Sequence, residues 1–158
     1  MAPSSTTAPD VAEIDVAAPP EAVWDLVSDV TQMGRWSPEC YRCEWLDGGT
    51  GPRETARFKG WNRQDLGPIP VKWATTSTVV ESERGEVFSF TTQNSGATWT
   101  YRFAPTPDGG THLTETRTDG EKPTVAKIFN VVMPGRAERL RDGMRQTLER
   151  LKAAAESA

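Results

Sequence analysis

Cysteine and histidine are scarce in this chain of 158 residues, and its basic residues are outnumbered by acidic ones. It contains two cysteines and one histidine, and its 18 basic and 22 acidic residues give a net charge of −4. Two cysteines are too few for a disulfide framework. A net negative chain also lacks the basic surface that neutralises phosphates. The composition therefore excludes a disulfide scaffold and argues against a nucleic-acid-binding protein.

Long apolar runs and well-known catalytic signatures are missing too. No stretch approaches the roughly 20 apolar residues of a membrane helix, and no basic-then-apolar leader opens the chain. We therefore expect a cytoplasmic protein without an integral membrane segment. The chain contains no G-x-S-x-G, Walker, G-x-G-x-x-G or H-E-x-x-H motif. We accordingly expect neither a metal nor a cofactor.

The length fits one domain, which we place at residues 11–158 after a disordered tail at residues 1–10. The segment 11–17 alternates like a short strand. A helix is expected from Pro20, because proline suits the first helical turn. Asp29 can cap a second short helix.

The middle of the chain, from Tyr41 to Thr118, predicts six further strands. Short β-branched and aromatic runs alternate with turn signals, which favours an antiparallel meander. The clearest run places Trp99, Tyr101 and Phe103 on one face. The turn signals fall at residues 47–52, 65–70, 81–86, 94–96 and 105–110.

The end of the chain predicts a long amphipathic helix, with a shorter helix at residues 124–133 before it. Its apolar stripe consists of Leu140, Met144, Thr147, Leu148 and Leu151. A sheet of seven strands curls strongly, so one straight helix covers its rim better than its centre. This order predicts an α+β fold with a pocket between the sheet and the helix.

Several phrases resemble the START/Bet v 1-like superfamily, and most closely its SRPBCC (polyketide cyclase/dehydrase-like) proteins of actinobacterial type. They are "IDVAAPPEAVWDLVSDVTQMGRWSPEC", "RFKGWNR", "TWTYRFAPTPDGGTHLTETR" and "GMRQTLERLKAAAE". The resemblance implies a helix-grip fold, in which a seven-stranded curved antiparallel sheet wraps around a long C-terminal helix. Two short helices follow the first strand in this fold. The resemblance also implies a cavity for a hydrophobic molecule.

Aromatic residues on the expected strands are candidates for the cavity wall, although any one of them can equally belong to the solid core. Phe58 shares a face with Ala56 and Gly60, and these small neighbours leave room. Gly143 interrupts the last helix, either for close packing against the sheet or to make space for a ligand. The expected ligand-binding residues are Trp36, Phe58, Trp61, Trp73, Phe88, Phe90, Trp99, Tyr101, Leu113, Gly143 and Met144.

Charged residues supply the polar candidates. Glu115 shares a strand face with Leu113, so it is either a solvated charge at an exposed strand end or a buried anchor or general acid/base. Burial would raise its pKa towards neutrality. His112 faces the other way, which argues against a dyad with Glu115. Arg35 is either a surface residue or a polar anchor for an acidic head group.

The Cys40-x-x-Cys43 pair leads into a strand and has no second pair to complete a zinc site. Residues three apart on a regular strand point to opposite faces and lie about 10 Å apart, too far for a disulfide. We interpret the pair as structural.

Three functions remain open. The first is the binding or transport of a hydrophobic small molecule such as a lipid, isoprenoid or polyketide, by a monomer or homodimer. The second is a polyketide cyclase/dehydratase with Glu115 as its catalytic residue, and the third is a protein-interaction or chaperone-regulator module. A mobile lid is expected at residues 62–70, with a hinge at residues 133–136.

Overall fold

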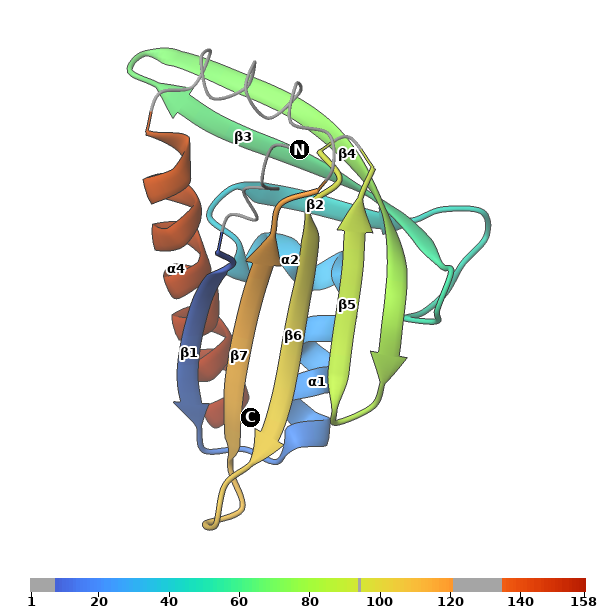
Figure 1. Cartoon of the computed structure of the whole chain (residues 1–158), viewed down its shortest axis with the longest axis vertical. Coiled ribbons are helices and arrows are strands. Elements are labelled where there is room, and N and C mark those ends of the chain that lie inside the picture. The colour runs from blue at the N-terminus through green and yellow to red at the C-terminus, as the bar shows by residue number, and fades with distance from the viewer. Residues whose placement is uncertain (1–7, 94, 121–134) are drawn as a thin grey trace, which may run out of the picture.

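The computed structural model describes residues 8–93, 95–120 and 135–158. Its seven strands form one antiparallel sheet in the order β1-β7-β6-β5-β4-β3-β2, with the long helix α4 beside it (Figure 1). The predicted helix-grip α+β fold is thereby confirmed. The strands are β1 (Asp10–Val16), β2 (Cys40–Trp45), β3 (Arg57–Leu66), β4 (Ile69–Glu83), β5 (Val87–Thr92), β6 (Thr98–Pro105) and β7 (Thr111–Thr118), and the helices are α1 (Pro20–Ser28), η1 (Val30–Gln32), α2 (Met33–Trp36) and α4 (Arg136–Glu156).

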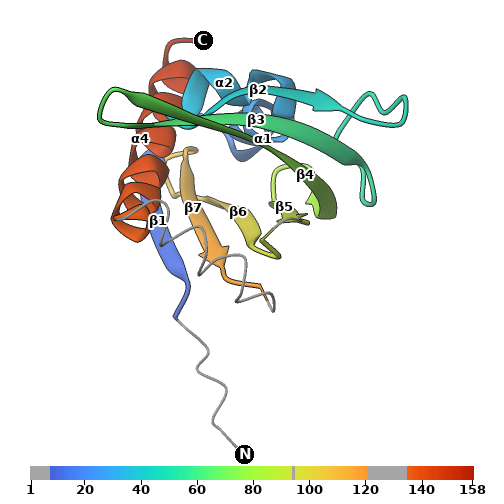
Figure 2. The ribbon, with the colours of Figure 1, turned by 90° about the horizontal axis from the view of Figure 1, so that it is seen from above.

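The sheet is strongly curved, and Figure 2 shows β2 and β3 in one layer with β5, β6 and β7 in the other. The 15-residue strand β4 connects the two layers. Register shifts interrupt the pairing of β2 with β3 and of β4 with β5, and such bulges increase bending. The curvature predicted from strand number is therefore reinforced by local irregularities.

The connection between β3 and β4 corrects the predicted lid. Residues 62–66 belong to β3 and residues 69–70 to β4, so the segment 62–70 is a hairpin rather than a loop. Gly67 makes the tight turn possible with a φ of 59°, in the left-handed region that glycine adopts readily. The predicted hinge begins outside the described residues, as do the expected helix at 124–133 and the first seven residues of the expected tail.

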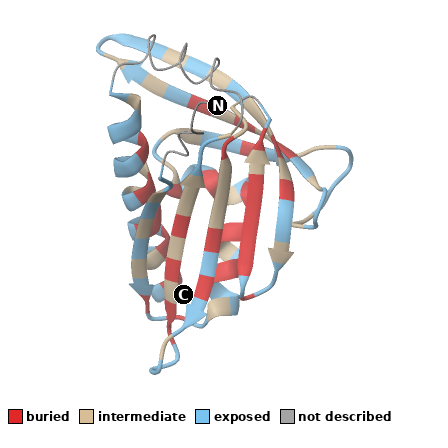
Figure 3. Ribbon diagram, in the orientation of Figure 1, coloured by how far each residue is buried: buried red, intermediate tan, exposed pale blue. Residues whose placement is uncertain are grey.

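A solid hydrophobic core fills one end of the sheet. The Trp24 indole N–H donates to the Val87 carbonyl (2.9 Å), and its ring packs edge-on against Phe88. Leu148 and Leu151 of α4 complete this core. Figure 3 shows β5 buried along most of its length, whereas the β3–β4 hairpin is largely exposed. Among the described helices, none combines the length and apolar character required to cross a membrane.

Candidate functional site

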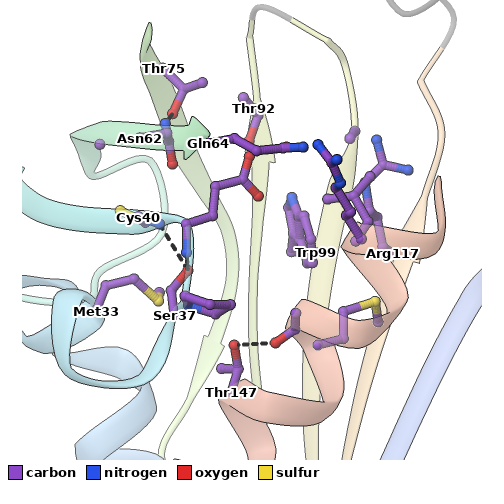
Figure 4. A pocket seen from close by; sticks show the side chains of 18 of the residues that line it. Met33, Ser37, Cys40, Asn62, Gln64, Thr75, Thr92, Trp99, Arg117 and Thr147 are labelled. Atoms are coloured by element: carbon purple, nitrogen blue, oxygen red, sulfur yellow. Dashed lines mark hydrogen bonds between the residues drawn. The ribbon is translucent and has the colours of Figure 1, made fainter. Parts of the chain in front are cut away.

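A cavity of about 990 Å³ lies between the concave side of the sheet, the corner formed by α2 and β2, and the N-terminal half of α4. In Figure 4, Cys40 and Asn62 lie on one side of this space, Trp99 and Arg117 on the other, and Thr147 on the helix. The volume lies at the upper end of the usual range for small-molecule sites, about 300–1,000 Å³. The fold thus encloses the space that its curvature predicts.

Most of the predicted site residues meet in this cavity wall. They come from five strands and from α4, and they combine aromatic surface with one buried carboxyl group. Gly143 and Met144 place the helix on one side of the space, opposite the aromatic residues of the sheet. The predicted residues in the wall are Phe58, Trp73, Phe90, Trp99, Tyr101, Glu115, Gly143 and Met144.

Three predicted residues lie in the solid core instead. Phe88 and Leu113 are 0 % exposed, and Trp36 is 2 % exposed. Phe88 and Leu113 point to the same face as the cavity residues two positions further along their strands, but they lie deeper, where side chains of α1 and α4 fill the space. The assignment of all three residues to the cavity wall is therefore wrong. For the two strand residues the reason is that alternation identifies the face of the sheet but not the depth along it.

Trp61 and Arg35 lie outside the cavity for a different reason. Phe58, Gly60 and Asn62 face the cavity from β3, so Trp61 points to the other face, where the Arg42 guanidinium lies 4.6 Å from its ring centroid. The Arg35 guanidinium lies over the Trp36 ring and donates to Gln32 at 2.5 Å. The alternation of β3 could have excluded Trp61, because Phe58 is three positions away.

Glu115 and Tyr101 form a buried pair inside the cavity wall. The Tyr101 hydroxyl donates to Glu115 Oε1 at 2.8 Å, and Glu115 is only 2 % exposed. Burial raises the pKa of Glu115 to about 8, although the hydrogen bond from Tyr101 lowers it. Burial also raises the pKa of Tyr101 well above its usual value, and the neighbouring carboxyl adds to this shift. The buried interpretation of Glu115 is therefore correct.

The second oxygen of Glu115 is left without a protein partner in the described part of the chain. Oε2 is buried and has no hydrogen-bond partner among the described residues. A pKa of about 8 leaves the carboxyl mostly protonated at neutral pH. Because Oε1 accepts from Tyr101, the proton belongs on Oε2. The pair therefore presents a neutral hydroxyl donor to the cavity.

Polar side chains that the sequence analysis missed surround the opposite end of the cavity. Arg136, in the first turn of α4, pairs with Glu39 and donates to Gln64 Oε1 at 2.8 Å. Its guanidinium also lies 5.1 Å from the Trp73 ring centroid. These contacts fix the start of α4 against β3 and β4. No local pattern in the sequence indicates them, because their partners are more than 60 residues apart.

Arg117 borders the same end from β7. It donates to Asp119 at 2.7 Å and lies over the Trp99 ring. Gln64 Nε2 is buried and finds no partner in the described part of the chain. The cavity wall thus combines aromatic surface with several separate polar groups.

The positions of the two cysteines differ most clearly from the prediction made from the sequence. Cys40 and Cys43 both line the cavity, and their sulfur atoms lie 3.3 Å apart. A register shift between Cys40 and Arg42 breaks the regular alternation. The prediction that the two thiols lie on opposite faces, too far apart for a disulfide, is therefore wrong. Within the described residues, no three His, Cys, Asp or Glu side chains form a group able to hold a metal ion.

His112 lies on the outer face of β7, as the alternation predicts. Its ring nitrogens contact Asp15 Oδ1 at 2.7 Å and Glu13 Oε2 at 2.6 Å. These two carboxylates raise the pKa of His112, Asp15 more than Glu13. His112 therefore takes no part in the cavity.

Comparison with known proteins agrees with this geometry. The model of the family described as "Polyketide cyclase / dehydrase and lipid transport" matches residues 11–156. The chain belongs to this family. The match covers nearly the whole chain, so the resemblance seen in the sequence is confirmed at the level of the family.

Solved structures support the same assignment. The Polyketide_cyc-like protein Cgl2372 of Corynebacterium glutamicum is 30 % identical, with 91 % of this chain and 88 % of that chain covered and a TM-score of 0.58. Protein CV1439 of Chromobacterium violaceum is 21 % identical, with 94 % and 98 % covered and a TM-score of 0.69. Protein Ms6760 of Mycobacterium smegmatis is 20 % identical, with 91 % and 88 % covered and a TM-score of 0.63.

Among curated proteins, none is similar enough in sequence to count as a match. The family description joins cyclase chemistry to lipid transport. Membership therefore gives the polyketide cyclase/dehydrase family and its fold, while the choice between binding and catalysis depends on the residues of this cavity.

Proposed function

We propose that this protein binds and carries a hydrophobic small molecule that contains a carbonyl or hydroxyl oxygen. The observation that carries the proposal is a cavity of about 990 Å³ with a buried Glu115 carboxyl in its wall. Phe58, Phe90 and Trp99 supply apolar and aromatic surface for a lipid, isoprenoid or polyketide-like molecule. Burial of apolar surface contributes about 25 cal/mol per Å² before the costs of ordering.

The Glu115–Tyr101 pair supplies the polar contact in this proposal. The proton on Glu115 Oε2 is donated to an oxygen of the ligand, which satisfies a carboxyl oxygen that the described residues leave without a partner. A buried polar group without a partner costs about 1–3 kcal/mol. A ligand with an oxygen at this position removes that cost, so the pair orients the ligand as well as binding it.

A direct test is to extract the purified protein with organic solvent and analyse the extract by mass spectrometry. We expect a hydrophobic compound at a stoichiometry close to one per chain. A second test uses Nile red, an apolar dye with a carbonyl group, in a fluorescence titration of protein from which lipid has been removed. Saturable one-to-one binding is expected, and the absence of saturation together with an empty extract would refute the proposal.

The polar contact has its own test. Above pH 8 Glu115 loses the proton that it donates, so the affinity for Nile red should fall roughly three- to tenfold. Glu115→Gln keeps a donor at this position and should bind Nile red with little dependence on pH. His112→Gln, on the opposite face of the same strand, is the matched control and should behave as the wild type. Equal pH profiles of Nile red affinity in wild type and Glu115→Gln would show that Glu115 does not donate a proton to the ligand.

A cyclase or dehydratase is the second candidate, and the pKa of Glu115 favours it. A carboxyl group with a pKa of about 8 can both donate and accept a proton near neutral pH. A shaped cavity can also hold the reactive carbons of a polyketide chain close together. We expect Glu115→Gln to abolish turnover of such a chain while binding remains. Unchanged turnover in this variant would exclude Glu115 as the catalytic residue.

A protein-interaction module receives less support. The large apolar side chains that are exposed in the described residues are Val11, Tyr41, Ile69 and Val80. They lie on β1, on β2 and at two separate places on β4. A docking surface would require a contiguous apolar patch, which these positions do not form.

A further inference from the structure

Cys40 and Cys43 are held together by an irregularity in β2. The register with β3 shifts between Cys40 and Arg42, so Cys40 pairs with Asn62 while Cys43 pairs with Gly60. Both side chains then point to the cavity side of the sheet, with their sulfur atoms 3.3 Å apart. A shortening to the covalent sulfur–sulfur distance of about 2.05 Å requires only a small movement.

Gly60 provides the space for the two thiols. A Cβ atom at this position would lie 3.4 Å from Cys43 Sγ, 3.5 Å from Cys40 Sγ and 3.3 Å from Thr75 Oγ1. Both sulfur atoms therefore lie over Gly60, at ordinary contact distance from the position of a Cβ, and Thr75 Oγ1 is the closer neighbour. The bulge and the glycine together bring the thiols into contact at one point of the wall.

The two thiols differ in accessibility and in acidity. Cys43 is buried, with 5 % exposure, whereas Cys40 is partly exposed. The hydrogen bond from Cys43 lowers the pKa of the Cys40 thiol, although burial opposes this effect. The same hydrogen bond, followed by burial and the charge of Cys40, raises the pKa of Cys43. Cys40 is therefore the thiol that ionises first and the one that a reagent in the cavity reaches first.

We propose that Cys40 and Cys43 form a reactive dithiol site that small disulfide compounds, such as oxidised glutathione, convert into an intramolecular disulfide. Cys40 is the attacking thiol and Cys43 the resolving thiol. The two thiols line the same cavity, so a bound ligand would hinder access of the reagent, but the exchange itself needs no ligand and the site stands apart from the function proposed above.

The reaction proceeds in two exchanges. The Cys40 thiolate attacks one sulfur of the small disulfide, which releases one thiolate and leaves a mixed disulfide on Cys40. The Cys43 thiol then loses its proton and attacks Cys40 Sγ, which releases the second small thiolate. In total the protein loses two electrons and two protons, and the small disulfide is reduced to two thiols.

Formation of the mixed disulfide itself activates Cys43. The pKa of Cys43 is raised by the hydrogen bond to Cys40, by burial and by the charge of Cys40. Once Cys40 carries a neutral disulfide, it has no charge, and burial is the main remaining cause of the raised pKa of Cys43. The second exchange is thereby favoured only after the first, and the buried thiol has its target within reach.

The test uses the reduced full chain, incubated with oxidised glutathione and analysed by intact-mass and peptide mass spectrometry. We expect the loss of two hydrogen atoms, no retained glutathione, and a peptide that links Cys40 to Cys43. Wild-type protein that keeps both thiols alkylatable would overturn the proposal. A stable glutathione adduct in place of the internal disulfide would overturn it as well.

Two matched variants test the separate roles. Cys43→Ser should retain glutathione on Cys40, and Cys40→Ser should react at least about tenfold more slowly, because its remaining thiol is buried. Equal rates in the two variants would contradict the assigned roles. Limited alkylation of the wild type, which should label Cys40 before Cys43, gives the same answer without relying on the folding of either variant. The oxidation uses protein freed of ligand, in which the disulfide can form even if Nile red never binds, so failure here is distinct from failure of the carrier proposal.

Discussion

The two ends of the curved sheet differ sharply, although the same strands build both. At one end Phe88, Leu113 and Leu148 pack with α1 into a solid core. At the other end Phe90, Glu115 and Met144 line a cavity. Each core residue has a neighbour in the cavity wall on the same element. Phe90 lies two residues after Phe88 on β5, Glu115 lies two residues after Leu113 on β7, and Met144 lies one helical turn before Leu148 on α4. The change from solid core to cavity therefore occurs within one step along each element.

The two ends differ in which helices cover the concave face of the sheet. The helices α1 and α2 and the C-terminal half of α4 cover the solid end. At the cavity end α4 is held to the sheet by Arg136, through Glu39 and Gln64 rather than through apolar packing. A polar connection at the rim leaves the centre of the sheet uncovered, because these side chains contact one another and the ring of Trp73 near the start of β4.

Removal of a ring from the solid end should have the largest effect. We expect Phe88→Ala to lower the free energy of unfolding by about 3–5 kcal/mol, the usual range for a buried phenylalanine. Phe90→Ala should cost roughly half as much, because one side of the Phe90 ring already faces the cavity and lacks packing partners. Chemical denaturation of both variants measures the difference. Equal losses would show that the two ends are packed alike.

Glu115, at the cavity end, makes the free energy of unfolding depend on pH. Its pKa is 4.5 in the unfolded chain and about 8 in the folded chain. Below pH 4.5 both states are protonated and burial carries no charge penalty. Between these values only the unfolded state ionises, so the free energy of unfolding falls as the pH rises, and above pH 8 the full penalty applies.

Glu115→Gln should remove this penalty. Because the penalty grows by about 1.4 kcal/mol for each pH unit above 4.5, we expect the variant to be more stable than the wild type by roughly 3 kcal/mol near pH 7 and nearly equal to it near pH 4. Gln can still accept the hydrogen bond from Tyr101. Denaturant titrations across this pH range measure the effect. A constant difference between the two proteins would show that Glu115 is not protonated by burial.

Alternation along the strands predicted much of this arrangement. It placed Trp99, Tyr101 and Phe103 on one face, and Glu115 on the inner face with His112 on the outer face, as observed. The pattern succeeded there because β6 and β7 pair without a register shift. The buried state of Glu115 could not be decided from the sequence, because burial depends on what lies across the cavity.

The failures have physical causes that a single strand does not display. The bulge in β2 moved Cys40 and Cys43 to the same face, and a bulge depends on the partner strand. The segment 62–70 is rich in polar residues and prolines, yet its backbone pairs as a hairpin. Phe88 and Leu113 were assigned the correct face but the wrong end of the sheet. Depth along the sheet is set by helices that are distant in sequence.

Gly143 allows a smaller test at the boundary between the two ends. Among the described residues, a Cβ at this position would meet Pro38 Cγ at 3.4 Å, which is ordinary contact. Gly143→Ala should therefore stabilise the protein by about 0.5–1 kcal/mol through helix propensity. Gly143→Leu should reduce Nile red binding, because the longer side chain extends into the cavity. If Gly143→Ala destabilised the protein, close packing would be the reason for the glycine.

Substitution of His112 should have the smallest effect on stability. His112 and Glu115 lie on opposite faces of β7, so the two substitutions compare those faces. The pKa of His112 is raised like that of Glu115, but by the attraction of Asp15 and Glu13 rather than by burial. Its stabilisation is therefore fully present below pH 6.5 and is lost as the pH rises through the higher folded pKa. Because the side chain is exposed and screened, we expect His112→Ala to cost less than about 0.5 kcal/mol at pH 6 and nothing near pH 9. Thermal unfolding at these two pH values, with and without added salt, tests this: a salt-independent loss would show that His112 acts through packing and not through its charge.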